Sequence, residues 1–70
     1  MKSIEAIEAE YKRARQKWPP LKSAHEGYAV FLEEAEEMWH EIKHGTKENA
    51  RMEAIQTGAM IVALLEEVLC

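Results

Sequence analysis

Two short stretches that a helix cannot run through divide this chain into three segments. The first is WPPLKS at residues 18–23, where consecutive prolines lack the backbone N–H of a helix and disfavour helical geometry in the residue before them. The second is HGT at residues 44–46, where we expect Gly45 to end a helix in a left-handed conformation and Thr46 to cap the next helix. Each segment is long enough for a helix, so the sequence predicts a single all-α domain that spans residues 1–70.

Capping residues and apolar spacing locate the three helices. Ser3 is expected to cap the first, and Ser23 with Glu26 has the spacing of a capping box that starts the second near Ala24. The second segment has apolar side chains at i, i+3, i+4 and i+7 spacing: Tyr28, Phe31, Leu32, Ala35, Met38, Trp39 and Ile42. We expect the third helix to run from Lys47 to about Leu69.

The third segment is apolar around almost its whole circumference, which predicts a helix that is enclosed on most sides. Two helices with one apolar stripe each cover only part of it. A 70-residue chain with a single cysteine also has no internal disulfide to reinforce its small core. We therefore predict that the three-helix protomer forms a helical bundle with other copies of itself, as a homodimer or homotetramer.

The charge balance excludes some partners. Thirteen acidic residues, all of them glutamate, outnumber nine basic residues and give a net charge of −4, which argues against binding to a nucleic-acid polymer or to a membrane surface. The first ten residues, MKSIEAIEAE, lack the apolar run of a signal peptide, and no apolar stretch reaches membrane-spanning length. With one cysteine, these features predict a cytoplasmic protein.

One stretch of the second segment matches a zinc-peptidase motif. His40, Glu41 and His44 have H-E-x-x-H spacing, in which two histidines one turn apart hold Zn²⁺. However, the helix is expected to end at Gly45, no convincing third ligand follows, and so short a chain offers little cleft. We expect that this motif does not form a peptidase site.

The acidic residues of the second segment form a second candidate site. Glu34, Glu37 and Glu41 project together beside the apolar stripe, and like charges three or four residues apart destabilise a helix by about 0.2–0.5 kcal/mol per pair. The third segment retains one polar strip, made of Asn49, Glu53, Gln56 and Glu67. A divalent cation shared between the two helices would relieve the repulsion. The alternative interpretation is an acidic face that is simply solvated.

These residues resemble a known family. LEEAEEMWHEIK (residues 32–43) is similar to the first metal-binding segment of the MazG-like, all-α nucleoside triphosphate pyrophosphohydrolases, and MEAIQTGAMIVALLEE (52–67) is similar to their second metal helix. WPPLKSAHEGYAVFLEE (18–34) also resembles short MazG-like proteins of phages and mobile elements, so the resemblance covers most of residues 18–66. The family pattern is E-x-x-E, a spacer and E-x-x-D. Glu34, Glu37 and Glu53 match its three glutamates, and Gln56 stands in place of the aspartate.

The resemblance implies a mechanism. Glu34, Glu37 and Glu53 would hold Mg²⁺, or Mn²⁺, that binds a nucleoside triphosphate and activates water, releasing a nucleoside monophosphate and pyrophosphate. Gln56 would be a neutral fourth ligand, with Glu41 as a possible replacement for the missing carboxylate. Substrate contacts are expected from Trp18, Lys22 and His25, which are weaker candidates. The alternative function is a non-catalytic, oligomeric helical interaction module.

Overall fold

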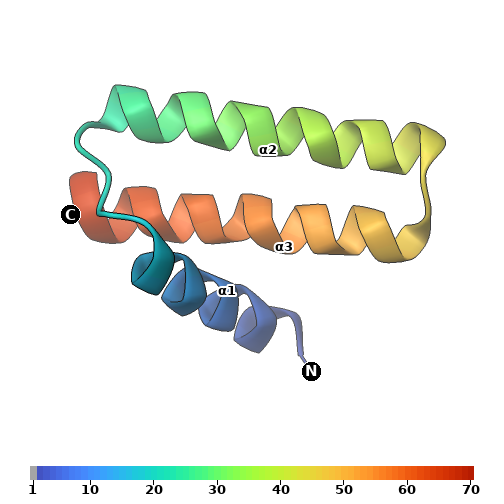
Figure 1. The fold of residues 1–70 in the computed structure, drawn as a ribbon, viewed down its shortest axis with the longest axis horizontal. Helices are drawn as coiled ribbons and strands as arrows, with labels where there is room; N and C mark the ends of the chain where they lie inside the picture. Colours follow the sequence, from blue (N-terminus) through green and yellow to red (C-terminus); the bar gives the residue numbers. More distant parts are fainter. Residues whose placement is uncertain (1) are drawn as a thin grey trace.

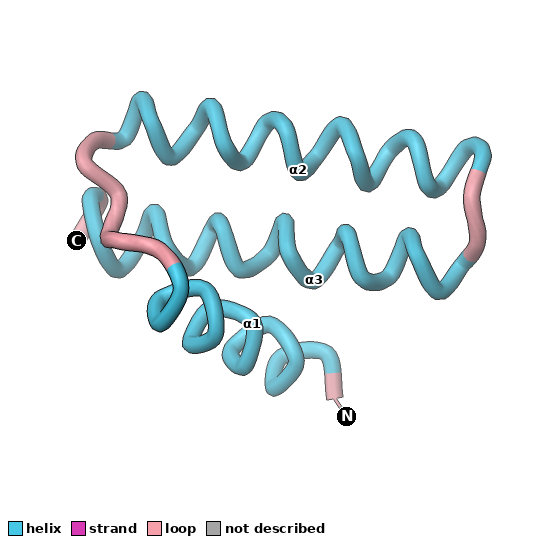
Figure 2. The backbone as a smooth tube through the Cα atoms, in the orientation of Figure 1, coloured by secondary structure: helices cyan, strands magenta, loops and turns pink. Residues whose placement is uncertain are grey.

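The computed structural model describes residues 2–70, which form three α-helices and one π-helical turn (Figure 1). They are α1 (Ser3–Lys17), α2 (Ala24–His44), α3 (Lys47–Ala63) and η1 (Leu64–Val68), which continues α3. α2 and α3 lie side by side as an antiparallel hairpin, and α1 crosses α3 obliquely (Figure 2). No strand occurs among residues 2–70, so the predicted all-α class is confirmed for this part of the chain.

The predicted caps of α2 and α3 are confirmed. The Ser23 hydroxyl accepts a hydrogen bond from the Glu26 backbone N–H at 3.1 Å, and the Thr46 hydroxyl accepts one from Asn49 at 3.0 Å. The Glu26 carboxylate accepts from the backbone N–H of Lys22 at 2.6 Å, one residue earlier than a capping box requires. Local side-chain chemistry therefore fixes where both helices begin.

Two details of the expected helix ends are wrong. Ser3 is already the first helical residue of α1, and its predecessor Lys2 occupies the cap position without a side-chain hydrogen bond, so the predicted Ser3 cap does not form. Gly45 ends α2 as expected but has φ −105° and ψ −147°, which is not left-handed. Only two residues connect α2 to α3, and Gly45 leads directly into the extended Thr46, so the chain leaves α2 in an extended geometry.

A small core joins the three helices. Its buried side chains belong mostly to α3 and η1: Thr57, Ala59, Ala63 and Leu64. The buried Gly27 lets α2 approach η1 closely, because a Cβ atom at this position would lie 2.5 Å from Leu64 Cδ2. No large side chain among the described residues is less than 2% exposed.

α3 contacts both other helices, yet its expected enclosure is incomplete within one chain. Ile61 is 41% exposed, and Leu65 in η1 is 55% exposed. Within a single protomer these side chains remain in contact with solvent, and the predicted oligomer stays a prediction. Among residues 2–70, no helix combines the length and the apolar character needed to cross a membrane.

Candidate metal centre

Three carboxylates meet between α2 and α3. Glu34 and Glu37 lie one turn apart on α2, and Glu53 faces them from α3. One carboxylate oxygen from each lies within 4.8 Å of the other two. Because α2 and α3 run antiparallel, residues on either side of the connection at 45–46 come face to face. The structure thus brings together the three glutamates that the sequence singled out.

The amide of Gln56 adjoins this cluster. When its nitrogen faces the carboxylates, it donates hydrogen bonds to Glu34 Oε2 at 3.1 Å and to Glu53 Oε1 at 3.3 Å. The opposite amide orientation has the same shape and turns the carbonyl oxygen toward the same carboxylates. An oxygen in that place is unfavourable next to two acceptors unless a cation lies between them. Gln56 can therefore either replace a cation or help to bind one.

The electrostatics of the cluster disfavour full ionisation. Partial burial raises the pKa of the Glu34 carboxyl, and the negative charges of Glu37 and Glu53 raise it further. Burial likewise raises the pKa of Glu53, with added repulsion from Glu37 and Glu41. A bound cation would reverse both effects, since it favours the charged form of each carboxyl.

Glu41 does not join the group of three. Its carboxylate folds against the end of α2, where a Cβ atom added to Gly45 would collide with the Glu41 carboxylate. Its charge still acts on the pKa of Glu53. In this structure, Glu41 thus contributes to the electrostatic field of the site without offering an oxygen to it.

α1 adds two residues that the sequence did not assign to this site. Glu10 has a side chain only 20% exposed, and its charge is among the causes that raise the pKa of Glu34. Arg13 holds the Glu10 carboxylate in a bidentate pair, with donor–acceptor distances of 2.6 and 3.1 Å. The sequence shows only that the two are one turn apart on α1. The place of Arg13 beside the carboxylates depends on how α1 crosses α3.

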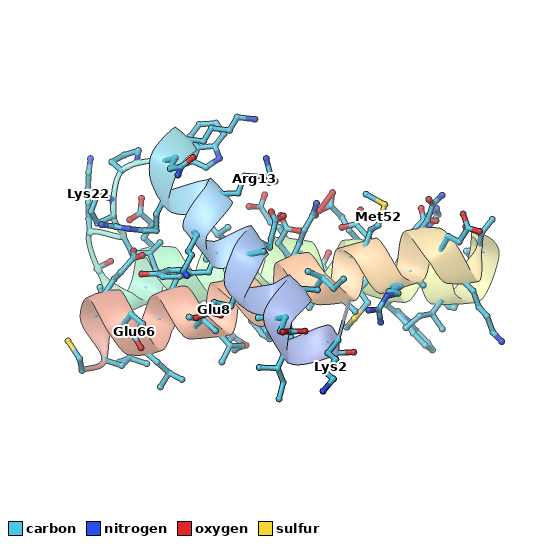
Figure 3. All side chains as sticks on the ribbon, turned by 90° about the horizontal axis from the view of Figure 1, so that it is seen from below. Lys2, Glu8, Arg13, Lys22, Met52 and Glu66 are labelled. Carbon is cyan, nitrogen blue, oxygen red and sulfur yellow. The ribbon has the colours of Figure 1, made fainter. Side chains whose placement is uncertain are left out.

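A groove of about 530 Å³ extends from Glu34 and Gln56, at the edge of this cluster, to the connection between α1 and α2. Glu37 and Glu53 are not part of its lining. Its lining includes Glu10, Arg13, Trp18, Lys22, Glu34 and Gln56. Figure 3 shows Arg13 and Lys22 along the same edge of the molecule. The groove thus joins acidic groups, cationic groups and an exposed aromatic ring within one concave surface.

Two other candidates lie outside the groove. His25 is exposed at the start of α2 and is not part of the groove lining. His40 and His44 are exposed near the end of α2, with ring centroids 5.3 Å apart. Within residues 2–70, Glu34, Glu37 and Glu53 are the one group of three or more potential ligands close enough to share an ion.

Comparison of the chain with protein-family models, with curated proteins and with solved structures gives no match. The chemistry of the site itself therefore carries the functional interpretation.

Proposed function

We propose that this protein is a Mg²⁺-dependent nucleoside triphosphate pyrophosphohydrolase of the MazG-like type, or a nucleotide-binding protein derived from one. The reaction converts a nucleoside triphosphate to the monophosphate and pyrophosphate. The observation that carries the proposal is the approach of Glu34, Glu37 and Glu53 to within 4.8 Å across two antiparallel helices, at the spacing of the family pattern.

The donor set fits a hard divalent cation. Three carboxylates and one amide oxygen are oxygen ligands, which Mg²⁺ and Mn²⁺ prefer. Mg²⁺ is commonly held by one or two carboxylates together with substrate phosphates, so a small cluster next to an open groove is sufficient. The raised pKa values of Glu34 and Glu53 are consistent with the same assignment, since they reflect burial and, after it, repulsion between the carboxylates, and a cation would offset both.

The carboxylate cluster and the groove beside it each have a role in the proposed reaction. Glu34, Glu37 and Glu53 would hold the metal, which supplies Lewis-acid stabilisation and lowers the pKa of bound water. Arg13, held in place by Glu10 at 2.6 Å, presents its charge to the groove for a phosphate group. Lys22 adds a second cation at the rim, and Trp18, which is 62% exposed, offers an aromatic face for a base.

A second candidate is the non-catalytic helical interaction module. The observation in its favour is Gln56, whose amide nitrogen can satisfy Glu34 and Glu53 together without any cation. In that case the carboxylates would be a partly solvated polar contact between α2 and α3.

Magnesium titration calorimetry and pyrophosphate release, measured over a panel of nucleoside triphosphates, separate the two functions. We expect Glu37→Gln and Glu53→Gln to abolish metal binding and activity without unfolding the protein, while Gln56→Asp tightens Mg²⁺ binding and raises activity by restoring a charge. Glu36→Gln is the matched control, since Glu36 is exposed on the other side of α2. If the two cluster variants bind metal and nucleotide like the wild type, the enzyme proposal should be abandoned.

A further inference from the structure

Two histidines of α2 lie outside both the carboxylate cluster and the groove. His40 and His44 are one helical turn apart on the same face, and both side chains are exposed. Their ring centroids are 5.3 Å apart, and the planes of the two rings are inclined by 56°. Imidazole nitrogens are the commonest protein ligands of metal ions, so the two rings form a candidate site with a different ligand chemistry from the carboxylates.

The separation of the two rings matches that of histidines sharing one zinc ion. A Zn–N bond is about 2.0–2.1 Å long, and the centroid of an imidazole lies roughly 1.1 Å behind the ligating nitrogen. Two imidazoles on one tetrahedral Zn²⁺ ion therefore have their centroids roughly 5.2 Å apart. Since the value for His40 and His44 is 5.3 Å, one ion bridges the two rings once a nitrogen of each is turned toward it.

The backbone holds both histidines at this spacing before any ion binds. His44 is the last residue of α2, and the final turn is closed by the Gly45 N–H, which donates to the Glu41 carbonyl at 2.9 Å. His40 lies one turn earlier in the same helix. Because the fold has already positioned the two ligands, little backbone freedom is lost when the ion binds. The unfolded chain does not maintain this spacing, so an ion at the pair stabilises the folded state.

The charges around the pair favour a cation. Glu36 and Glu37 lie about one turn before His40. Glu41 has the same relation to His44. The pair also lies at the C-terminal end of α2, where the free carbonyl groups of a helix carry partial negative charge. The field at the two imidazoles is therefore negative.

The cation next to the pair in sequence is held elsewhere. Positions 39 and 43 form a row of their own on α2, rotated by about 100° from the row of the two histidines. In that row the Lys43 ammonium lies 5.0 Å from the centroid of the Trp39 ring, whose face attracts it. The lysine is thus drawn away from the imidazoles and leaves the space between them to another cation.

We propose that His40 and His44 together bind a divalent transition-metal ion, with Zn²⁺ as the ion whose geometry fits the pair. The histidines supply two ligands and water supplies the others, since within residues 2–70 no third potential ligand lies close enough to share an ion with them. This is a surface chelate, which needs neither the third protein ligand nor the cleft of a peptidase site. Oxygen ligands suit Mg²⁺ and Mn²⁺ whereas imidazoles suit Zn²⁺, so this site is separate from the carboxylate cluster and does not depend on the proposed enzymatic function.

Calorimetric titration of the protein with zinc chloride tests the proposal. Cys70 is free and exposed, and a thiol is itself a zinc ligand, so Cys70→Ser is the background for every variant. We expect one equivalent of Zn²⁺ to bind at the pair. His40→Ala and His44→Ala should each weaken this binding at least about 10-fold, because even loss of a group that only supports a zinc ligand costs that much. His25→Ala is the matched control, since His25 is an exposed histidine near the other end of α2 and its removal should leave zinc binding unchanged.

Two further variants separate the pair from other modes of zinc binding. Glu53→Gln removes a carboxylate of the cluster and should leave the affinity of the pair unchanged. If Glu53→Gln removes the bound zinc instead, the ion lies in the cluster and the proposal fails. The double variant Glu41→His with His44→Glu keeps composition and net charge but places its histidines side by side, about 100° apart around the helix, so it should bind zinc as weakly as His44→Ala. If this double variant, His40→Ala or His44→Ala binds zinc like the background, the two histidines do not act as a pair and the proposal is overturned.

Discussion

Glu67 lends itself to a sharp test of what holds α1 and its connection to the rest of the fold. Its side chain is 9% exposed, although it is a carboxylate in a small protein. One oxygen accepts a hydrogen bond from the backbone N–H of Leu21 at 2.8 Å, and the other lies 3.3 Å from the Arg15 guanidinium. Burial and a hydrogen bond to Glu67 also raise the pKa of the Tyr11 hydroxyl. Glu67 thus ties α1, the connection at residues 18–23 and η1 together.

The contacts of Glu67 give the expected cost of its removal. A hydrogen bond to a charged group contributes about 1.5–3 kcal/mol, and Glu67→Ala leaves the Leu21 N–H without that partner. The ion pair with Arg15 adds less than about 1 kcal/mol, because Arg15 is 39% exposed and solvent screens the pair. We therefore expect Glu67→Ala to lower the free energy of unfolding by about 2–4 kcal/mol. Glu67→Gln keeps one carbonyl acceptor and should cost about half as much.

Urea unfolding at a fixed protein concentration measures this effect, with concentration held constant because association contributes to apparent stability. Glu66→Ala is the matched control, since Glu66 is an exposed neighbour in η1 and its removal should change the free energy of unfolding by less than about 0.5 kcal/mol. If Glu67→Ala and Glu66→Ala have the same stability, Glu67 does not hold these segments together and the reasoning is refuted.

Three further predictions concern stability, the first two measured by the same urea unfolding. Gly27→Ala should lower the free energy of unfolding by about 1–3 kcal/mol, because the new Cβ atom would lie 2.5 Å from a leucine side chain. Gly58→Ala should be close to neutral, because the nearest atom to its Cβ, at 2.9 Å, is the tip of an isoleucine side chain. Ser23→Ala should cost about 1 kcal/mol through loss of the cap of α2, and an equal stability would contradict the capping role. The pKa values of Glu34 and Glu53 are higher in the folded than in the unfolded state, so protonation of these carboxyls stabilises the metal-free protein. This stabilisation is fully present below the unfolded-state pKa of 4.5 and is lost as the pH rises through the folded-state pKa values. Stabilisation by Mg²⁺, measured as a shift in melting temperature, should accordingly be larger at pH 7.5 than at pH 5.

Local signals made the helix boundaries predictable from the sequence. Ser23 and Thr46 act through hydrogen bonds to backbone groups three residues away, so their roles need no knowledge of the fold. The prolines after Trp18 act in the same local way, and Trp18 is extended as a residue before proline should be. The helical spacing of Glu34 and Glu37 was equally visible in the sequence. The antiparallel packing of α2 and α3 places Glu53 next to them.

Other features depend on tertiary contacts and could not be predicted in this way. The proximity of Glu10 to Glu34 is set by the angle at which α1 crosses α3, which no local pattern specifies. Glu67 was visible as part of a polar strip, but its partners lie 46 residues or more away along the chain. Gly45 is followed directly by Thr46, the extended N-cap of α3, and the two-residue connection leaves no room for the usual left-handed ending of a helix.

The two proposed functions differ in what they require of Gln56. With its nitrogen turned inward, the amide bonds to Glu34 and Glu53 and lowers the repulsion in the cluster, so the metal-free fold has less to gain from a cation. With its oxygen turned inward, the same amide becomes a neutral ligand, and both hydrogen bonds must first be given up. Binding of free Mg²⁺ is therefore opposed by the loss of these bonds and by the missing charge. A triphosphate that brings its own Mg²⁺ adds phosphate ligands to the same ion and offsets this cost. On the proposed function, Mg²⁺ and nucleotide should thus bind together far more tightly than either binds alone, and Gln56→Asp should reduce that dependence.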